Sequence, residues 1–281
     1  MEKIKFTKMH GAGNDYIYID CMDGTPMDGP SLAVAMSPRR FSVGSDGVVL
    51  ICPSDVADAR MRMYNQDGSE GLMCGNAIRC IGKFLRERGY TDKNVVTVET
   101  ASGVKTLALN EKDGTVVSVS VDMGRAIISP RLVPVLFDGE RMVDEPIEAR
   151  GAEYRVTAVS MGNPHAVIFT ENISDLDLEK IGPDFENHPL FPDRVNTEFC
   201  EVAAPGVITM RVWERGSGET FACGTGACAS AVAAVLTGRA SAGEPILLRL
   251  RGGDLTITVR DGLSVTMEGP AKIVYDGEFY L

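Results

Sequence analysis

Two cysteines that lie 149 residues apart stand in the same short motif. Residues 70–75 read Glu-Gly-Leu-Met-Cys-Gly and residues 219–224 read Glu-Thr-Phe-Ala-Cys-Gly, so both follow the pattern Glu-x-x-x-Cys-Gly. A helix N-terminus lowers the pKa of a thiol, because its unpaired N–H groups and its dipole favour the thiolate. Each cysteine directly precedes a stretch with a helical pattern. Cys74 and Cys223 are therefore candidate acid/base groups.

The other five cysteines are expected to be small core residues, since free cysteine is usually buried. Zinc binding is disfavoured, because neither motif cysteine has a second cysteine at the two-residue spacing of zinc knuckles. Residues 224–229 fit the loose Gly-x-Gly-x-x-Ala fingerprint of nucleotide binding, but no buried parallel strand precedes them. We therefore expect no metal and no cofactor. The five core cysteines are Cys21, Cys52, Cys80, Cys200 and Cys228.

The offset of 149 residues extends beyond the cysteines and indicates an internal duplication. The matched pairs are Met61 and Met210, Arg62 and Arg211, Tyr64 and Trp213, and Asn14 and Asn163. A chain of 281 residues is long enough for two domains with separate cores. We expect an N-terminal half formed by residues 1–123 plus 271–281 and a C-terminal half formed by residues 124–270.

The pattern of each half predicts an α+β fold, in which a curled, mostly antiparallel sheet or barrel surrounds one central helix. The central helices are expected at residues 76–88 and 225–236, and the second is so apolar that it should be buried. Residues 31–40 predict a short helix, and residues 125–150 and 174–194 predict loops. Strands are expected at 4–9, 16–20, 47–52, 59–64, 95–99, 104–109, 115–121, 155–160, 166–170, 197–202, 209–213, 246–250, 255–259 and 263–267.

The end of the chain has no counterpart in the second repeat. Residues 271–275 are apolar apart from Lys272 and follow the last predicted strand of that repeat. We expect them to return to the first half as an additional strand, which would connect the two halves.

Composition excludes two classes of partner. The chain has 28 basic and 39 acidic residues, a net charge of −11, which repels nucleic-acid phosphates and anionic lipid. No apolar run approaches the roughly 18 residues of a membrane span, and the first residues do not form a signal peptide. We expect a cytoplasmic protein that binds a small molecule and neither nucleic acid nor membrane.

Six motifs in the same order resemble those of the diaminopimelate epimerase family, and the resemblance spans nearly the whole chain. They are His10-Gly-Ala-Gly-Asn-Asp15, Asn65-Gln-Asp-Gly-Ser-Glu70, Met73-Cys-Gly-Asn76, Met161-Gly-Asn-Pro-His165, Arg194-Val-Asn196, and Glu214-Arg-Gly-Ser-Gly-Glu219 followed by Ala222-Cys-Gly-Thr-Gly-Ala227. Proline racemase and the phenazine-pathway isomerase belong to the same wider superfamily.

The resemblance implies a cofactor-independent isomerase of lysine and peptidoglycan precursor biosynthesis, which interconverts LL- and meso-diaminopimelate. It implies that Cys74 and Cys223 exchange protons with opposite faces of the α-carbon. The active site is then expected in the cleft between the two halves. It further implies a homodimer.

The resemblance also implies the residues that hold the substrate. Backbone N–H groups at Gly75-Asn76 and Gly224-Thr225 are expected to bind the α-carboxylate. Gly47 stands where some members carry a substrate-facing glutamine, so that contact is expected to be absent or filled by water, and Ala77 stands where glycine is common. The expected side-chain ligands are Asn14, Asn65, Asn163, Asn196, Glu214 and Arg215.

The repeat loses its symmetry at two ionisable residues. Subtracting 149 maps His165 onto Tyr16 and Glu214 onto Asn65. Because catalysis needs one thiolate and one thiol at the same moment, we expect His165 and Glu214 to make the two cysteines unequal. Two alternatives stay open: a racemase of another amino acid in the same superfamily, and an amino-acid-binding protein without catalysis.

Overall fold

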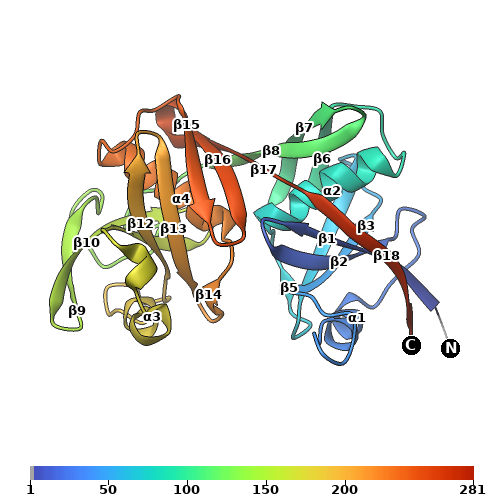
Figure 1. Cartoon of the computed structure of the whole chain (residues 1–281), viewed down its shortest axis with the longest axis horizontal. Coiled ribbons are helices and arrows are strands. Elements are labelled where there is room, and N and C mark those ends of the chain that lie inside the picture. The colour runs from blue at the N-terminus through green and yellow to red at the C-terminus, as the bar shows by residue number, and fades with distance from the viewer. Residues whose placement is uncertain (1–2) are drawn as a thin grey trace. The chain divides into compact units, whose positions relative to one another are not determined.

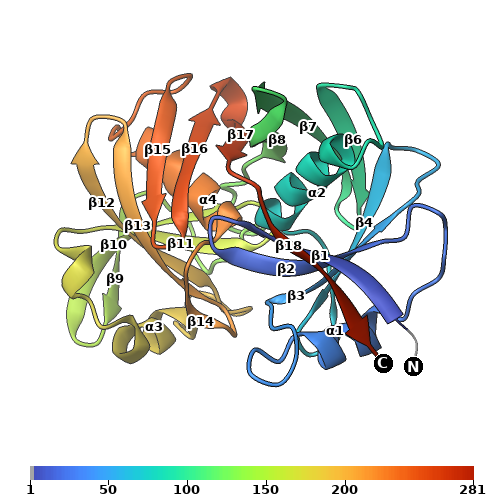
Figure 2. The ribbon, with the colours of Figure 1, turned by 45° about the vertical axis from the view of Figure 1, so that its right-hand side comes forward.

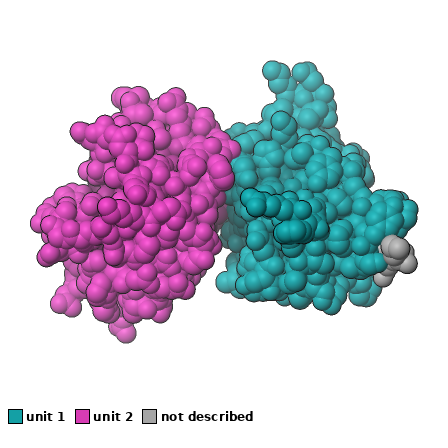
Figure 3. Space-filling model, turned by 60° about the horizontal axis from the view of Figure 1, so that its bottom comes forward, with its two compact units in different colours: residues 1–122, 268–281 teal, residues 123–267 magenta. Residues whose placement is uncertain are grey.

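The computed structural model describes residues 3–281, so Met1 and Glu2, which the sequence assigns to the N-terminal half, lie outside the described residues. The chain divides into two compact units, coloured separately in Figure 3. Unit 1 comprises Met1–Asp122 with Glu268–Leu281, and unit 2 comprises Met123–Met267. None of the helices within residues 3–281 is long and apolar enough to cross a membrane.

Unit 1 is a curled sheet that packs around helix α2 (Figure 1). Helix α2 (Gly75–Glu87) is buried from its first residue to Leu85, and it contacts strands β1, β2, β7 and β18. The strands of this unit are β1 (Lys3–Gly11), β2 (Asn14–Asp20), β3 (Gly47–Cys52), β4 (Ala59–Asn65), β5 (Glu70–Gly71), β6 (Val95–Thr100), β7 (Gly103–Lys112), β8 (Thr115–Arg125) and β18 (Lys272–Tyr280), and a short helix is α1 (Gly29–Met36).

Unit 2 has the same plan around helix α4 (Gly224–Leu236) (Figure 2). The predicted burial of this apolar helix is confirmed, since nearly all of its residues are buried. The other elements are β9 (Glu145–Ala149), β10 (Ala152–Ser160), β11 (Pro164–Phe169), η1 (Ile173–Asp175), α3 (Leu178–Glu186), β12 (Asn196–Ala204), β13 (Val207–Glu214), β14 (Gly218–Thr220), β15 (Pro245–Leu250), β16 (Gly253–Val259), η2 (Asp261–Leu263) and β17 (Ser264–Gly269).

The strand pairing repeats between the units, which confirms the predicted duplication. In unit 1, β2 and β3 are parallel with Ile17 opposite Val48. In unit 2, β11 and β12 are parallel with Ala166 opposite Thr197, a register displaced by 149 residues at both positions. The remaining pairs described in each unit are antiparallel, apart from the parallel contacts β4 to β6 and β13 to β15.

The prediction of loops is confirmed for residues 126–144, which form only one isolated bridge at Ile127, but strand β9 follows at Glu145–Ala149. The prediction is wrong for residues 174–194, which contain the end of η1 and the whole of α3. Prolines suggested loops, but Pro183 lies inside α3, which the Asp177 side chain caps at its N-terminus. A helix is expected there on physical grounds, because the parallel strands β11 and β12 need a crossover connection. Helix α1 makes the equivalent crossover between β2 and β3.

The two crossover helices pack against their sheets through one glycine each. A Cβ atom at Gly29 of α1 would lie 2.0 Å from the Tyr64 ring, and a Cβ atom at Gly182 of α3 would lie 2.2 Å from the Trp213 ring. Tyr64 and Trp213 are a matched pair of the repeat. The glycines therefore let each helix approach the aromatic ring of strand β4 or β13.

We expect Gly182→Ala to destabilise unit 2, because the added methyl group must push α3 away from the Trp213 ring. Overpacking of this kind reduces the free energy of unfolding by about 1–3 kcal/mol. Thermal unfolding followed by circular dichroism measures the effect. Glu179→Ala, an exposed change in the same helix, is the control. A melting temperature equal to that of the parent would contradict the packing argument.

The last strand of the chain belongs to unit 1. Strand β18 pairs antiparallel with β1, with Lys3 opposite Tyr280 and His10 opposite Lys272. Figures 1 and 2 both show the two strands side by side. The prediction that the chain returns to the first half as an additional strand is thereby confirmed.

Candidate active site

Cys74 occupies the N-cap position of helix α2. Its backbone is extended, and its carbonyl accepts the N–H of Ile78 at 3.0 Å, so the helix begins directly after it. Its thiol is half-buried and donates to Oδ1 of Asn14 at 3.3 Å. Unit 1 thus brings together two predicted site residues from β2 and from the start of α2.

Cys223 occupies the same position at helix α4, but it is buried. Its Sγ accepts the backbone N–H of Gly226 at 3.3 Å and lies 3.5 Å from the Thr225 hydroxyl. The predicted placement of both motif cysteines at helix N-termini is confirmed.

The pKa of Cys223 is raised well above its usual value, so the expected lowering at the helix start is not met here. Burial is the main cause, followed by the negative charges of Glu214 and Glu198, and the hydrogen bonds from Thr225 and Gly226 oppose them only in part. The structure therefore favours the protonated thiol of Cys223, and the carboxyl groups of Glu214 and Glu198 lie near it.

Glu214 lies at the end of β13 and is one of those carboxylates. Burial raises the pKa of Glu214, and hydrogen bonds with Thr220 and with the Cys223 thiol oppose the rise. A carboxylate with a raised pKa beside a thiol can take up the thiol proton. Glu214 and Cys223 thus form a pair that can exchange a proton.

His165 is fully buried between two partners. Its Nδ1 lies 2.7 Å from Oε1 of Glu198, and its Nε2 lies 3.0 Å from Oδ1 of Asn163. His165 and Asn163 were predicted as site residues, whereas Glu198 was not. Within unit 2 the predicted histidine is therefore held by a predicted asparagine and by an additional carboxylate.

Glu198 is fully buried, and its Oε2 atom has no hydrogen-bond partner among the described residues. Its Oε1 atom faces the first turn of α4, where a Cβ atom at Gly226 would lie 2.5 Å from it. The sequence signal was a glutamate inside an apolar strand, between Thr197 and Phe199. A buried acid in such a strand needs a charged or polar partner, and here the partner is His165.

Two further predicted ligands in unit 2 hold each other in place. The Asn196 amide donates to the carbonyl of Pro164 at 2.8 Å and accepts the backbone N–H of Arg215 at 3.0 Å. The guanidinium group of Arg215 donates to the carbonyl of Asp193 at 2.8 Å. Asn196 therefore fixes the backbone that carries Arg215.

Asn65 and Gly47 are neighbours in unit 1, opposite each other on β4 and β3. The Asn65 amide donates to the Ser69 hydroxyl at 3.0 Å and the residue is exposed. A Cβ atom at Gly47 would lie 2.0 Å from the carbonyl oxygen of Tyr64. The backbone here leaves no room for a side chain, which accounts for the glycine at this position.

The glutamate of each Glu-x-x-x-Cys-Gly motif forms a structural ion pair. Glu70 accepts two hydrogen bonds from Arg62, at 2.9 and 3.2 Å. Glu219 accepts two from Arg211, at 2.8 and 3.1 Å. These arginines are themselves a matched pair of the repeat, so the repeated glutamates connect β4 to β5 and β13 to β14.

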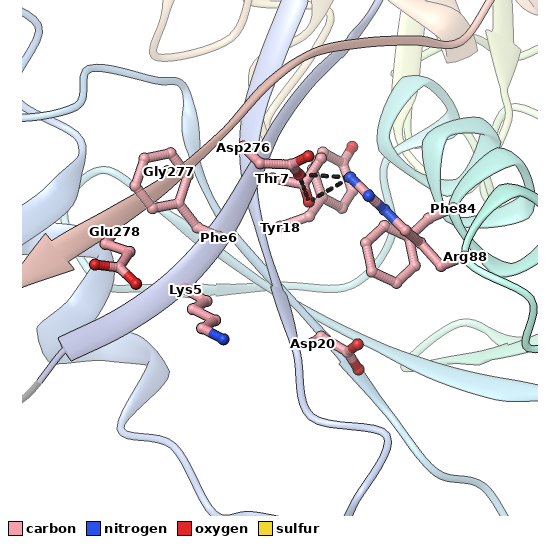
Figure 4. A pocket seen from close by; sticks show the side chains of 10 residues that line it. All are labelled: Lys5, Phe6, Thr7, Tyr18, Asp20, Phe84, Arg88, Asp276, Gly277 and Glu278. Carbon is pink, nitrogen blue, oxygen red and sulfur yellow. Dashed lines mark hydrogen bonds and ion pairs between the residues drawn. The ribbon is translucent and has the colours of Figure 1, made fainter.

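A pocket on unit 1 contains none of the predicted site residues (Figure 4). It lies between β1, β2, the end of α2 and β18. Arg88 and Asp276 form an ion pair along it. The pocket is lined by Lys5, Phe6, Thr7, Tyr18, Asp20, Phe84, Arg88, Asp276, Gly277 and Glu278.

Comparison with solved structures shows the fold. A hydroxyproline epimerase from Agrobacterium vitis superposes with a TM-score of 0.70 at 18% identity, covering 99% of this chain and 91% of that chain. A Bacillus anthracis phenazine biosynthesis protein of the PhzF family gives 0.71 at 17% identity, covering 100% of both chains. The predicted α+β fold of two repeated halves is confirmed.

Comparison of sequences is more specific. The profile of the diaminopimelate epimerase family matches residues 6–129 and 157–274. The diaminopimelate epimerases of Acetivibrio thermocellus and Methanococcus maripaludis are 52% and 50% identical over 276 residues, covering 98% of this chain and 98% and 99% of those proteins. The matched residues include both cysteine motifs. The chain therefore belongs to the diaminopimelate epimerase family.

Proposed function

We propose that the protein interconverts LL- and meso-diaminopimelate by two-base proton transfer. The observation that carries the proposal is the pair of matched N-cap cysteines, one in each unit, in a chain of this family. Inversion at a carbon needs an acid and a base on opposite faces, because a single base tends to return the proton to its own side.

The carboxylate of Glu214 accepts the Cys223 proton in this proposal. The resulting thiolate removes the α-proton from one face of the substrate, and the Cys74 thiol delivers a proton to the other face. The reverse reaction exchanges the two roles. His165 and Glu198 make the surroundings of Cys223 unlike those of Cys74, which supports the expected inequality of the two thiols.

Backbone N–H groups stabilise the negative charge that develops on the α-carboxylate. Gly75-Asn76 and Gly224-Thr225 lie in the first turns of α2 and α4, where N–H groups have no helical acceptor. Arg215 is the proposed partner of the distal carboxylate, because a guanidinium group binds carboxylates with two parallel hydrogen bonds. Asn14, Asn65, Asn163, Asn196 and Gly47 complete the proposed substrate site.

Solvent deuterium tests the reaction directly. Incubation of LL-diaminopimelate with the protein in D₂O is expected to place deuterium at the α-carbon of the meso product, as measured by NMR. Parallel assays with proline and hydroxyproline separate this activity from that of other racemases. Tight binding of diaminopimelate without deuterium entry would instead indicate a binding protein.

Removal of metal ions is expected to leave turnover unchanged, because the proposed chemistry uses only thiols, carboxylates and backbone N–H groups. Protein dialysed against a chelator under reducing conditions should retain its full rate and show no pyridoxal absorption. Protein dialysed without chelator is the control. A rate restored only by added metal or pyridoxal phosphate would disprove this part of the proposal.

The family resemblance alone leads us to include two further properties in the proposal. The enzyme is a homodimer and acts in the cytoplasm, in the formation of lysine and peptidoglycan precursors. Sedimentation measures the first property and fractionation of cells measures the second.

A further inference from the structure

Cys21 and Cys52, which the proposed mechanism does not use, lie side by side at the ends of two neighbouring strands. Strands β2 and β3 are parallel with Asp20 opposite Ile51, so the next opposed pair is Cys21 and Cys52. The backbone N–H of Cys21 donates to the carbonyl of Ile51 at 2.8 Å, which extends the ladder to this pair. Neighbouring strands lie about 4.8 Å apart, within the Cα separation that a disulfide bridges.

The two side chains also point to the same face of the sheet. Cys21 belongs to a buried hydrophobic cluster of unit 1, and the half-buried Cys52 packs against that cluster. The Cys21 thiol is hydrogen-bonded to Cys52, and this contact, together with Arg62 and Arg60, lowers the pKa of Cys52 to about 7 against the effect of burial. Cys52 is thus the more acidic and more accessible thiol of the pair.

We propose that Cys21 and Cys52 form a site of reversible oxidation by hydrogen peroxide, separate from the catalytic thiols. The Cys52 thiolate attacks one oxygen, the O–O bond breaks, and the departing hydroxide takes up a proton to become water. Cys21 then attacks the sulfenic sulfur, the S–S bond forms, and a second water leaves. Two thiols and one peroxide yield one disulfide and two waters.

Peptide mapping by mass spectrometry tests this site in protein that carries Cys74→Ser and Cys223→Ser, so that the other reactive thiols cannot exchange with it. Peroxide is expected to give a peptide pair linked through Cys21 and Cys52, which dithiothreitol separates. Cys21→Ser should divert Cys52 to the sulfinic acid, and Cys52→Ser should leave Cys21 reduced. Sulfinic acid at Cys52 without a linked peptide, or no oxidation of either thiol, would overturn the proposal.

A second, independent observation concerns the orientation of the Asn14 amide. Its Nδ2 atom lies 2.7 Å from Oδ2 of Asp46. Since a carboxylate only accepts hydrogen bonds, the NH₂ end of the amide must face it. Arg39 holds Asp46 in place, because it donates to Oδ1 of Asp46 at 2.6 Å and to Asp15 at 2.7 and 3.2 Å.

The opposite end of the same amide faces Cys74. Oδ1 of Asn14 lies 3.3 Å from Sγ, and an amide oxygen can only accept, so Cys74 donates its thiol proton. This contact favours the protonated thiol. A rotated amide would present NH₂ to the sulfur and favour the thiolate.

We propose that Asp46 is a positioning residue, which holds Asn14 with its oxygen toward Cys74 and so maintains Cys74 as a proton donor. The catalytic role of Asp46 rests on the proposed function, whereas the orientation of the Asn14 amide does not. Other ionisable groups of unit 1 that interact with Cys74 are Tyr18 from β2 and Cys80 from α2. Arg39 and the backbone N–H of Asp15 contact Asp46, and Lys8 forms an ion pair with Asp15.

The rate of Cys74 alkylation by iodoacetamide, followed by peptide mapping between pH 6 and 10, tests this role without any assay of turnover. The asparagine in Asp46→Asn can donate as well as accept a hydrogen bond, so it no longer fixes which end of the Asn14 amide faces Cys74. We expect the midpoint of the pH profile of alkylation to move downward. Because only the thiolate reacts, a midpoint that lies one pH unit lower gives an alkylation rate at pH 7 that is about tenfold higher. Asp113→Asn, an exposed change in the β7–β8 turn, is the matched control.

A double-mutant cycle separates positioning from a simple change of charge. In protein that carries Asn14→Ala, adding Asp46→Asn is expected to change the midpoint little, because the amide is no longer present. An equal shift in both backgrounds would mean that Asp46 acts through its charge, and no shift in either would mean that it does not act on Cys74. Both results overturn the proposal, and neither bears on whether the protein is an epimerase.

Discussion

Replacing Cys74 or Cys223 by alanine is expected to abolish epimerisation. Each thiol supplies a proton or removes one on its own face of the α-carbon, and a water molecule at the vacant position is a far weaker base. Because the two groups act as a unit, we expect either change to reduce kcat by at least about 10⁴-fold. A coupled or chiral assay of meso-diaminopimelate formation measures the loss.

The matched controls are Cys21→Ala and Cys52→Ala, which remove thiols of unit 1 that the mechanism does not use. These variants should retain turnover under reducing conditions. Stoichiometric alkylation of the parent should inactivate it, and substrate should protect it. Substantial turnover in either Cys74→Ala or Cys223→Ala would disprove the two-base mechanism.

Glu214→Gln is expected to weaken catalysis and to stabilise the fold at the same time. Glutamine keeps the shape of the side chain but cannot accept the Cys223 proton, so we expect kcat to fall by about 10²- to 10⁴-fold. Burial raises the pKa of Glu214, so ionisation of this carboxyl group is less favourable in the native state than in the unfolded state. The free energy of unfolding contributed by this group therefore decreases as pH rises from the unfolded pKa through the folded pKa.

Thermal unfolding of Glu214→Gln and parent between pH 4 and pH 8 measures the second effect. The two melting temperatures should converge at the acid end, and the variant should be the more stable protein at pH 8. His165→Gln is the companion variant. Glu214→Gln and His165→Gln should each change the pH profile of turnover, by unequal amounts in the forward and reverse directions of epimerisation. Parental pH profiles for both variants would place the source of asymmetry elsewhere.

The sequence predicted those helices and strands whose signal lies within one short segment. The apolar run of α4 and the alternating strands are visible in single segments. Helix α3 was missed because Pro183 and the polar residues around it are typical of a loop. What requires the helix is the parallel pairing of β11 with β12, which is a property of the sheet and not of the segment.

The candidate site divides in the same way. Cys74, Cys223 and Glu214 stand in contiguous motifs, so their types and spacing could be interpreted directly. Glu198 and Asp46 contact the motif residues His165 and Asn14 from other strands or loops, and only the folded chain brings them together. The same limit applies to the raised pKa of Cys223, because burial and two carboxylates outweigh the helix N-terminus that the sequence reveals.

The pairing of β1 with β18 has a consequence for how the chain is made. Strand β18, one of the two strands that pair with β1, is synthesised after the whole of unit 2, so the sheet of unit 1 is incomplete until β18 has left the ribosome. Unit 2 is continuous from Met123 to Met267 and has all of its own segments earlier. During synthesis, therefore, the half encoded second is the first that can finish folding, and the half encoded first keeps an open strand edge at β1 until β18 has been made.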